Sequence, residues 1–425
     1  MELKKYKLGD IAEIYISSID KKSKEGEQSV RLCNFVDIYH NWAITKDLVP
    51  NFMIASANDN NIKRFSLKEG YVAFTKDSET RDDIGIPAYI ADDLDNTVLG
   101  YHCALVKPNA DILSGKYLNT FLHSDYIKKY FELNATGSGM RYTLSTETLN
   151  NIPILVPSLE MQEYIGNIFS NIDRKICLNR QINDNLEAMA KQLYDYWFVQ
   201  FDFPNEEGKP YKSSGGAMVY NEKLKREIPQ GWTAAKIKDV AQTYSGGTPT
   251  STNSEYYDGG NIPWINSGEL NNSIITSTTN YITEEGLKNS SAKLYPQDTI
   301  LVALYGATAG KVSLLSFEAC SNQAVCGVIP PNKIMTTYIR YYLFSLYEHF
   351  ITLSSGSARD NISQETIKNT ILPIPQEKIL KEYSDAVAPI ISKTIANQKE
   401  MENLTKQRDE LLPLLLNGQA SVNSD

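Results

Sequence analysis

The chain has 425 residues, of which 42% are hydrophobic and 22% are charged, and its formal net charge is −9. This composition is ordinary for a globular protein of two to four domains, and the acidic balance argues against a non-specific nucleic-acid binder, which would be basic overall. No run of roughly 18 apolar residues indicates a membrane helix, and the N-terminus carries no apolar secretory segment. We therefore expect a cytoplasmic protein without membrane contact.

Cysteine and histidine are spaced too widely to predict a metal site. The five cysteines form no CxxC pair, and the four histidines are scattered. Neither a zinc site nor a disulfide framework follows from such spacing. We expect buried, reduced thiols, no metal and no cofactor.

The chain repeats itself with a period of about 220 residues, and such repeats decide architecture. The repeated blocks are KLGDIAEIY and KIKDVAQTY, CALVKPN and CGVIPPN, YLNTFLHS and YIRYYLFS, and finally GSGMRYTLSTETLNNIPILVP (137–157) and GSARDNISQETIKNTILPIP (356–375). Their common order indicates two similar domains. Short β-rich runs such as GYVAFT and TILVALYG predict a small, irregular sheet in each.

Each repeat ends in a long helical segment. The first covers about 159–197, with apolar residues at Ile168, Ile172, Ile176, Ile182, Leu186, Met189 and Leu193. The second covers about 377–416, and both stripes have steps of mostly three and four, as in a coiled coil. About 40 helical residues span roughly 60 Å. A narrow stripe on so long a helix needs a partner helix, and the other repeat offers one.

The predicted fold class is therefore α+β (α/β), with two similar recognition domains related by pseudo-twofold symmetry and separated by two long antiparallel coiled-coil helices. Between the repeats, residues 200–229 are rich in Gly, Pro, Ser and charge, which indicates a connector. The expected boundaries are 1–157 for the first domain, 158–199 for the central helix, 200–229 for the connector, 230–375 for the second domain, 376–418 for the distal helix and 419–425 for a tail.

The second repeat and the helix ends resemble the specificity subunits of type I restriction-modification enzymes. The motifs are IPQGW, KIKDVAQTYSGGTP, IPWINSGEL, ALYGATAGKV and SNQAV in the second repeat, with LYDYWFVQFDFP and QRDELLPLLLNGQASV closing the helices. Each motif alone is weak, but their order and twofold repetition over nearly the whole chain make the set specific. The first repeat departs from it, with IYISSID in place of SGGTP and FTKDSETRDDIGIPAYI in place of the GATAGKV turn.

The resemblance implies a non-catalytic subunit that reads a bipartite site in double-stranded DNA, one half-site per recognition domain. It also implies two methyltransferase subunits and two restriction (translocase) subunits as partners. The two recognition domains of such proteins read different half-sites, which fits the divergence of the first repeat.

Arginine at equivalent places in both repeats is the leading candidate for DNA contact. Arg141 and Arg359 each follow a small-residue loop, and arginine can grip a phosphate or a guanine edge bidentately. The alternative is an ion pair within the domain, with Glu147 or Glu365 as partner. The full set of predicted DNA-binding residues is Lys76, Arg81, Arg141, Tyr142, Thr248, Asn266, Tyr305, Lys311, Asn322, Gln323, Arg359 and Asn361.

Other functions are less well supported by the residues. GATAGKV has three residues between its glycines where a phosphate loop needs four, so a strand-to-strand turn offering Lys311 to a DNA phosphate is the better interpretation. No methyltransferase or nuclease motif stands out. A coiled-coil scaffold or adaptor that binds protein rather than DNA, and a pair of degenerate enzyme domains, remain the alternative hypotheses.

Overall fold

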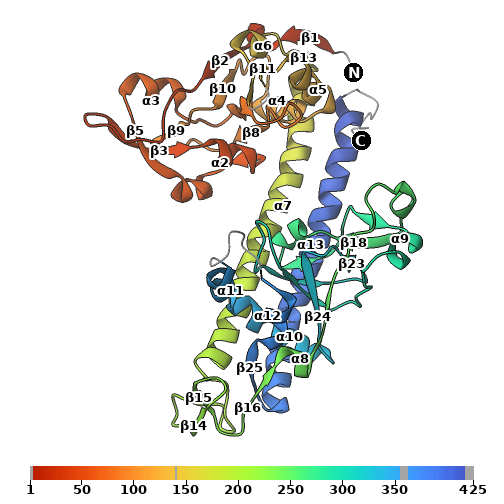
Figure 1. Ribbon diagram of the computed structural model, residues 1–425. Helices are drawn as coiled ribbons and strands as arrows, with labels where there is room; N and C mark the ends of the chain where they lie inside the picture. Colours follow the sequence, from red (N-terminus) through yellow and green to blue (C-terminus); the bar gives the residue numbers. More distant parts are fainter. Residues whose placement is uncertain (1–2, 139–140, 355–361, 417–425) are drawn as a thin grey trace, which may run out of the picture. The chain divides into compact units, whose positions relative to one another are not determined.

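A computed structural model describes residues 3–138, 141–354 and 362–416. The chain forms two compact units, one made of residues 1–178 with 401–425 and the other of residues 179–400. The helices α7 (Leu159–Tyr194) and α13 (Glu377–Leu416) each contribute residues to both units. Their bounds agree with the helices predicted from the apolar stripes (Figure 1).

The first unit is built around a five-stranded sheet. Its strands, in spatial order, are β2 (Ala12–Ile16), β10 (Cys103–Pro108), β6 (Val72–Thr75), β8 (Pro87–Ile90) and β4 (Ala43–Ile44), antiparallel except for β4 beside β8. Smaller sheets join β5 (Met53–Ala57), β3 (Gln28–Cys33) and β9 (Thr97–Leu99); β11 (Thr136–Ser138), β12 (Arg141–Thr143) and β7 (Asp77–Ser78); and β1 (Lys4–Lys7) with β13 (Pro153–Val156). The helices are α1 (Leu8–Ile11), α2 (Phe35–Tyr39), η1 (Lys46–Asn51), α3 (Asp59–Phe65), α4 (Gly115–Leu122), α5 (Asp125–Asn134) and α6 (Thr146–Asn150).

The second unit repeats this topology. Its five-stranded sheet has the order β17 (Gln242–Ser245), β24 (Val325–Ile329), β21 (Ile300–Ala303), β22 (Val312–Leu315) and β19 (Ile274–Ile275), again with only the last pair parallel. Smaller sheets join β20 (Tyr281–Ile282), β18 (Ile262–Ile265) and β23 (Cys320–Ser321), and β16 (Thr233–Lys236) with β25 (Ile371–Ile374). The helices are α8 (Ile237–Val240), η3 (Ser254–Tyr256), η4 (Ser267–Asn271), α9 (Glu284–Lys288), α10 (Lys333–Ser345), α11 (Tyr347–Ser354) and α12 (Gln364–Asn369).

Matched hydrogen bonds show that the repeat extends to side chains. Ser145 caps α6 by accepting a hydrogen bond from the Thr148 amide, and Ser363 caps α12 in the same way. Serine suits this position because its hydroxyl satisfies an amide that the first helical turn leaves unpaired. The hydroxyl of Tyr117 on α4 donates to a backbone carbonyl of β13, and that of Tyr338 on α10 donates to one of β25. The sequence repeat is therefore a structural repeat.

The C-terminal end of each long helix packs into the recognition domain other than the one that leads directly into that helix. After Tyr194, α7 continues as a π-helical turn, η2 (Asp195–Val199), whose Phe198 lies 4.8 Å from the ring of Tyr383 in the core of the second unit. At the end of α13, Leu412, Leu415 and Leu416 are buried in the core of the first unit. These contacts explain why both helices close on aromatic- or leucine-rich motifs.

The helix pair within the second unit is more polar than a heptad stripe predicts. Asn397 donates to the side chain of Asn183 at 2.9 Å, and Asn179 donates to Glu400 at 2.8 Å, which fixes an antiparallel register. Ile182 and Met189, predicted to lie in the stripe, are instead 41% and 56% exposed. The prediction was wrong at these two positions. Around Ile182, the side-chain amides of Asn179 and Asn183 occupy the interface instead.

The segment predicted as a connector is folded. It contains the hairpin of β14 (Met218–Asn221) and β15 (Arg226–Pro229). Phe201 and Phe203 pack against Trp232, with ring centroids 5.5 and 5.4 Å apart. The Gly, Pro and Ser residues that suggested a connector lie largely in the turns of this small element.

Candidate DNA interface

Four polar residues of the first unit meet where the strand β6 ends. Lys76 and Asp77 follow β6, His102 lies in the turn before β10, and Arg141 begins β12. Two backbone hydrogen bonds hold these segments together: the Lys76 amide donates to the His102 carbonyl at 2.8 Å, and the Leu144 amide donates to the Lys76 carbonyl at 2.9 Å. These four residues, together with Thr143 on β12, form what is called the first-domain cluster below.

Asp77 is the centre of the first-domain cluster. Its Oδ1 accepts a hydrogen bond from Lys76 Nζ at 2.8 Å, while its Oδ2 accepts one from Arg141 Nη2 at 3.1 Å and lies 2.5 Å from His102 Nδ1. Lys76 Nζ also donates to the hydroxyl of Thr143 at 2.9 Å. One carboxylate therefore joins three segments that are far apart in the sequence.

The charge state of Asp77 follows from these contacts. Burial alone would raise its pKa, but hydrogen bonds from Lys76, Thr143 and His102 outweigh burial and lower the pKa to about 2. The carboxylate is thus ionised at neutral pH. Its side chain is 9% exposed, whereas that of Arg141 is 56% exposed, so a buried anion holds a cation at the surface.

Arg141 borders two open hollows of about 570 and 490 Å³, and both are also lined by Asp77 and His102. Beside them, the guanidinium of Arg81 lies 5.0 Å from the ring centre of Tyr142. The fold therefore brings the four residues predicted from the first repeat, Lys76, Arg81, Arg141 and Tyr142, to one neighbourhood.

Sequence reasoning missed Asp77 and His102. The alternative to DNA contact was an ion pair of Arg141 within its own domain, for which Glu147 was an example, and such a pair is present but with Asp77. The backbone of His102 has a φ of +69°, which is uncommon for a residue other than glycine. The signal in the sequence was the position of Asp77 two residues after the end of a buried strand.

The second unit assembles its candidate residues at the equivalent place. The Leu304 amide donates to the Ala324 carbonyl at 2.8 Å, as Lys76 does to His102, and the Ile362 amide donates to the Leu304 carbonyl, as Leu144 does to Lys76. Tyr305 thus follows β21 where Asp77 follows β6. The loops that diverge most in sequence occupy the same position in the two domains.

Side-chain amides dominate at this place in the second unit. Asn322 Nδ2 donates to Asn266 Oδ1 at 3.2 Å, and the hydroxyl of Thr248 donates to Gln323 Oε1. These four residues form the second-domain cluster. Thr248 and Gln323 are exposed, while Asn266 and Asn322 are half-buried. Amides offer both donors and acceptors, which suits the edges of bases better than phosphates.

The GATAGKV segment connects the antiparallel strands β21 and β22. A phosphate loop would instead lead from a strand into a helix, so the segment is a strand-to-strand turn, and a contact of Lys311 with a DNA phosphate stays a prediction. Lys311 is held at the end of this connection, where Nζ donates to Asn271 Oδ1 at 2.5 Å. Arg359 and Asn361, the remaining candidates, lie outside the described residues.

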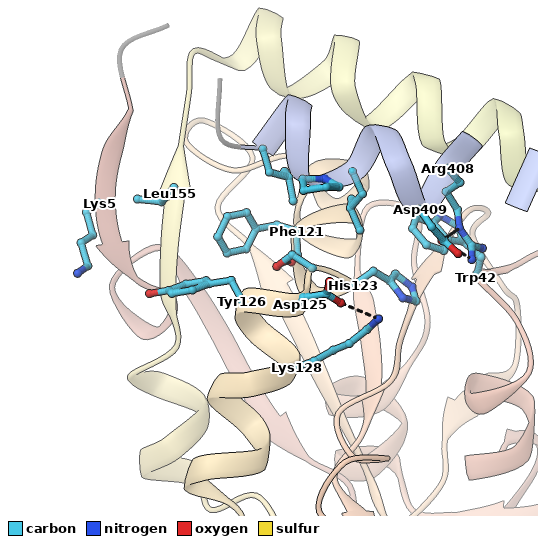
Figure 2. Close-up of a pocket in the computed structure, with 14 residues that line it drawn as sticks. Lys5, Trp42, Phe121, His123, Asp125, Tyr126, Lys128, Leu155, Arg408 and Asp409 are labelled. Carbon is cyan, nitrogen blue, oxygen red and sulfur yellow. Dashed lines mark hydrogen bonds and ion pairs between the residues drawn. The ribbon is translucent and has the colours of Figure 1, made fainter. Parts of the chain in front are cut away.

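A further cavity lies elsewhere in the first unit, with a volume of about 730 Å³ between α4, α5 and the end of α13 (Figure 2). Trp42 stacks on His123 with centroids 3.8 Å apart, and Arg408 lies 5.3 Å from the Trp42 ring centre. Burial, followed by the positive charges of Arg408 and Lys128, lowers the pKa of His123 to about 3. His123 is therefore neutral and lies where the end of α13 packs against the first domain.

Among the described residues, no group of three or more His, Cys, Asp or Glu side chains is arranged to hold a metal ion. Cys33, Cys103, Cys320 and Cys326 are buried thiols. No described helix is long and apolar enough to cross a membrane.

Comparison with known proteins identifies relatives over most of the chain. The family model described as "Type I restriction modification DNA specificity domain" matches residues 1–188 and 229–406. The type I restriction enzyme HindI specificity subunit of Haemophilus influenzae is 28% identical over 83% of this chain and 87% of its own. The MjaIX specificity subunit of Methanocaldococcus jannaschii is 27% identical over 90% and 87%. The S subunit from M. genitalium shares the fold, with a TM-score of 0.57 at 14% identity over 97% of this chain and 96% of that chain.

Proposed function

Because the chain belongs to the type I restriction-modification DNA specificity family, we propose that its sequence specificity resides in the two strand-end clusters, one for each half of a bipartite DNA target. The observation that carries this proposal is the equivalence of the two places. The first cluster lies after the central strand β6 and beside the turn that precedes β10. The second lies beside the turn that precedes β24, where the Ala324 carbonyl accepts a hydrogen bond from Leu304 at the end of the central strand β21. Loops that differ on an identical scaffold are the expected arrangement for two readers of different sequences.

The chemistry of the two clusters supports two different half-sites. The first cluster presents an exposed arginine, which suits guanine, and the second presents amides, which suit adenine. Arg81, which lies beside the first cluster, and Lys311, at the end of the β21–β22 connection, are the proposed phosphate contacts. A protein of net charge −9 gains little from the general attraction of cations to DNA, so contacts at defined positions must supply the selectivity.

The chain acts in this proposal without catalysis of its own, as part of a complex. Two methyltransferase subunits and two restriction subunits are the proposed partners, and they supply the chemistry as well as much of the phosphate neutralisation. The support is the family membership together with the acidic charge of this chain. A complex with this chain should therefore bind its target far more tightly than the chain alone.

The test is methylation-motif sequencing of a host that carries the partner genes and variants of this chain. Arg141→Ala should alter the methylated motif at one half-site, and Gln323→Ala at the other. Lys4→Ala is the matched control, because Lys4 is an exposed cation on β1. This strand leads through α1 to the start of β2, at the end of the sheet away from the first-domain cluster. An unchanged motif with both cluster variants would favour the adaptor hypothesis, in which this chain binds protein and another subunit reads the DNA.

A further inference from the structure

The contacts of Arg141 restrict the ligands that it can bind. Its Nη2 donates to Asp77 Oδ2 at 3.1 Å and contacts both ring nitrogens of His102, with Nε2 at 3.0 Å. Between described residues, no other nitrogen of this guanidinium has a hydrogen-bond partner, and an arginine has five N–H donors. One corner of the planar group is therefore anchored, while the rest remains available beside the two hollows.

The anchor has opposite consequences for a phosphate and for a base. Asp77 is ionised, so its negative charge reduces the attraction of Arg141 for a phosphate. The same anchor fixes the plane of the guanidinium, which a flexible contact to phosphate does not need. Bidentate donation to the O6 and N7 atoms of guanine does need a fixed plane, and these acceptors belong to a base without net charge.

The backbone of His102 is a second observation that supports a fixed orientation of the Arg141 guanidinium. Its backbone adopts the left-handed conformation, with a φ of +69°, and its ring lies against Asp77 Oδ2. Non-glycine residues held in this conformation cluster at functional sites, because the surrounding structure must maintain them. Lys76 occupies the other oxygen of Asp77 and leaves Oδ2 for His102 and Arg141.

We propose that Arg141 reads a guanine in the half-site bound by the first recognition domain, and that Asp77 and His102 are positioning residues for it. The inference rests on the proposed function and adds to it the identity of one base. It assigns Arg141 to base recognition and leaves the phosphates to other exposed cations such as Arg81.

The experiment uses the complex with methyltransferase subunits and a duplex that carries the motif found by methylation sequencing. Binding is measured over a salt series for the wild-type chain, Arg141→Ala, Arg141→Lys and Asp77→Asn. Each guanine of the half-site that Arg141→Ala alters is replaced in turn by 7-deazaguanine, which removes the N7 acceptor. Gln323→Ala serves as the control in the other domain.

We expect Arg141→Ala to weaken binding of the target about ten- to a hundredfold and to abolish discrimination at one guanine. Replacing the same guanine by 7-deazaguanine should weaken wild-type binding and have little further effect on Arg141→Ala. Arg141→Lys should behave like Arg141→Ala, because lysine lacks the planar fork. Asp77→Asn should reduce discrimination at that guanine alone, while Gln323→Ala leaves it intact.

Two results would overturn the inference. In one, Arg141→Ala weakens binding equally on all sequences and reduces the salt slope by about one unit, as loss of a phosphate contact does. In the other, the half-site bound by the first domain contains no guanine. The proposed function fails separately, if neither cluster variant changes the methylated motif.

Discussion

Removal of a single carboxylate from α7 should loosen the second recognition domain. Arg340 on α10 is 2% exposed, and its Nη2 donates to Glu187 Oε2 at 2.9 Å. Its other partners are neutral: the Ser273 carbonyl at 3.2 Å and the Tyr341 hydroxyl at 3.1 Å. In Glu187→Ala, the buried guanidinium would keep only these neutral acceptors.

The size of the effect follows from the burial of the pair. Breaking a buried ion pair by removing one partner destabilises a protein by about 3–5 kcal/mol. Because the Glu187 side chain is 18% exposed and two acceptors remain, we expect the lower end, about 3 kcal/mol. For a unit of this size, that corresponds to a fall in Tm of about 6–12 °C. Glu187→Gln retains an acceptor and should lose only about 1–2 kcal/mol.

Urea denaturation followed by tryptophan fluorescence measures the change, because three of the four tryptophans lie in the second unit. Asp195→Ala is the matched control on the same helical segment, since it breaks the partly exposed Lys191–Asp195 pair. The double variant Glu187→Leu with Arg340→Met should recover most of the loss. If Glu187→Ala is no more destabilising than the control, Arg340 does not depend on this carboxylate.

Three further predictions concern acid stability, self-association and helix length. Folding lowers the pKa of Asp77 to about 2, from about 3.9 in the unfolded chain. Its contribution to the free energy of unfolding is therefore complete above pH ~4 and is lost as the pH falls towards 2. In Asp77→Asn, the free energy of unfolding should depend less on pH over this acid range, as measured by denaturation at a series of pH values. A fragment ending at Pro204 should dimerise through its uncovered helix, and a monomer in sedimentation velocity would contradict this. Four residues inserted after Asn183 together with four before Asn397 keep the helices in register and add roughly 6 Å. Motif sequencing should then show a spacer about two base pairs longer with unchanged half-sites, whereas an unchanged spacer would show that helix length does not set it.

The sequence alone predicted the features that depend on order along the chain. The two long helices follow from apolar periodicity, and the repeat follows from blocks that recur in the same order. Ser145 and Ser363 were paired by alignment alone, and both cap equivalent helices. Local patterns suffice in these cases because the physics of a helix and its cap is itself local.

The features that depend on topology could not be predicted. Asp77, His102 and Arg141 meet only because β6, β10 and β12 come together in the fold. Their spacing in the sequence does not predict this contact. The exposure of Ile182 could not be predicted either. The side-chain amides of Asn179 and Asn183 occupy the interface between the helices, and the spacing of apolar residues does not predict where polar side chains pair.

The packing of Leu412, Leu415 and Leu416 into the first unit has a consequence for biosynthesis. The ribosome completes residues 1–178 first, yet the segment that finishes their core is translated about 240 residues later. At roughly 5–20 residues per second, this delay is about 12–50 s. The nascent first domain thus carries an unfilled apolar groove throughout translation of the second, when chaperones have access to it. A premature stop codon after residue 400 would impair the domain made first and spare the one made last.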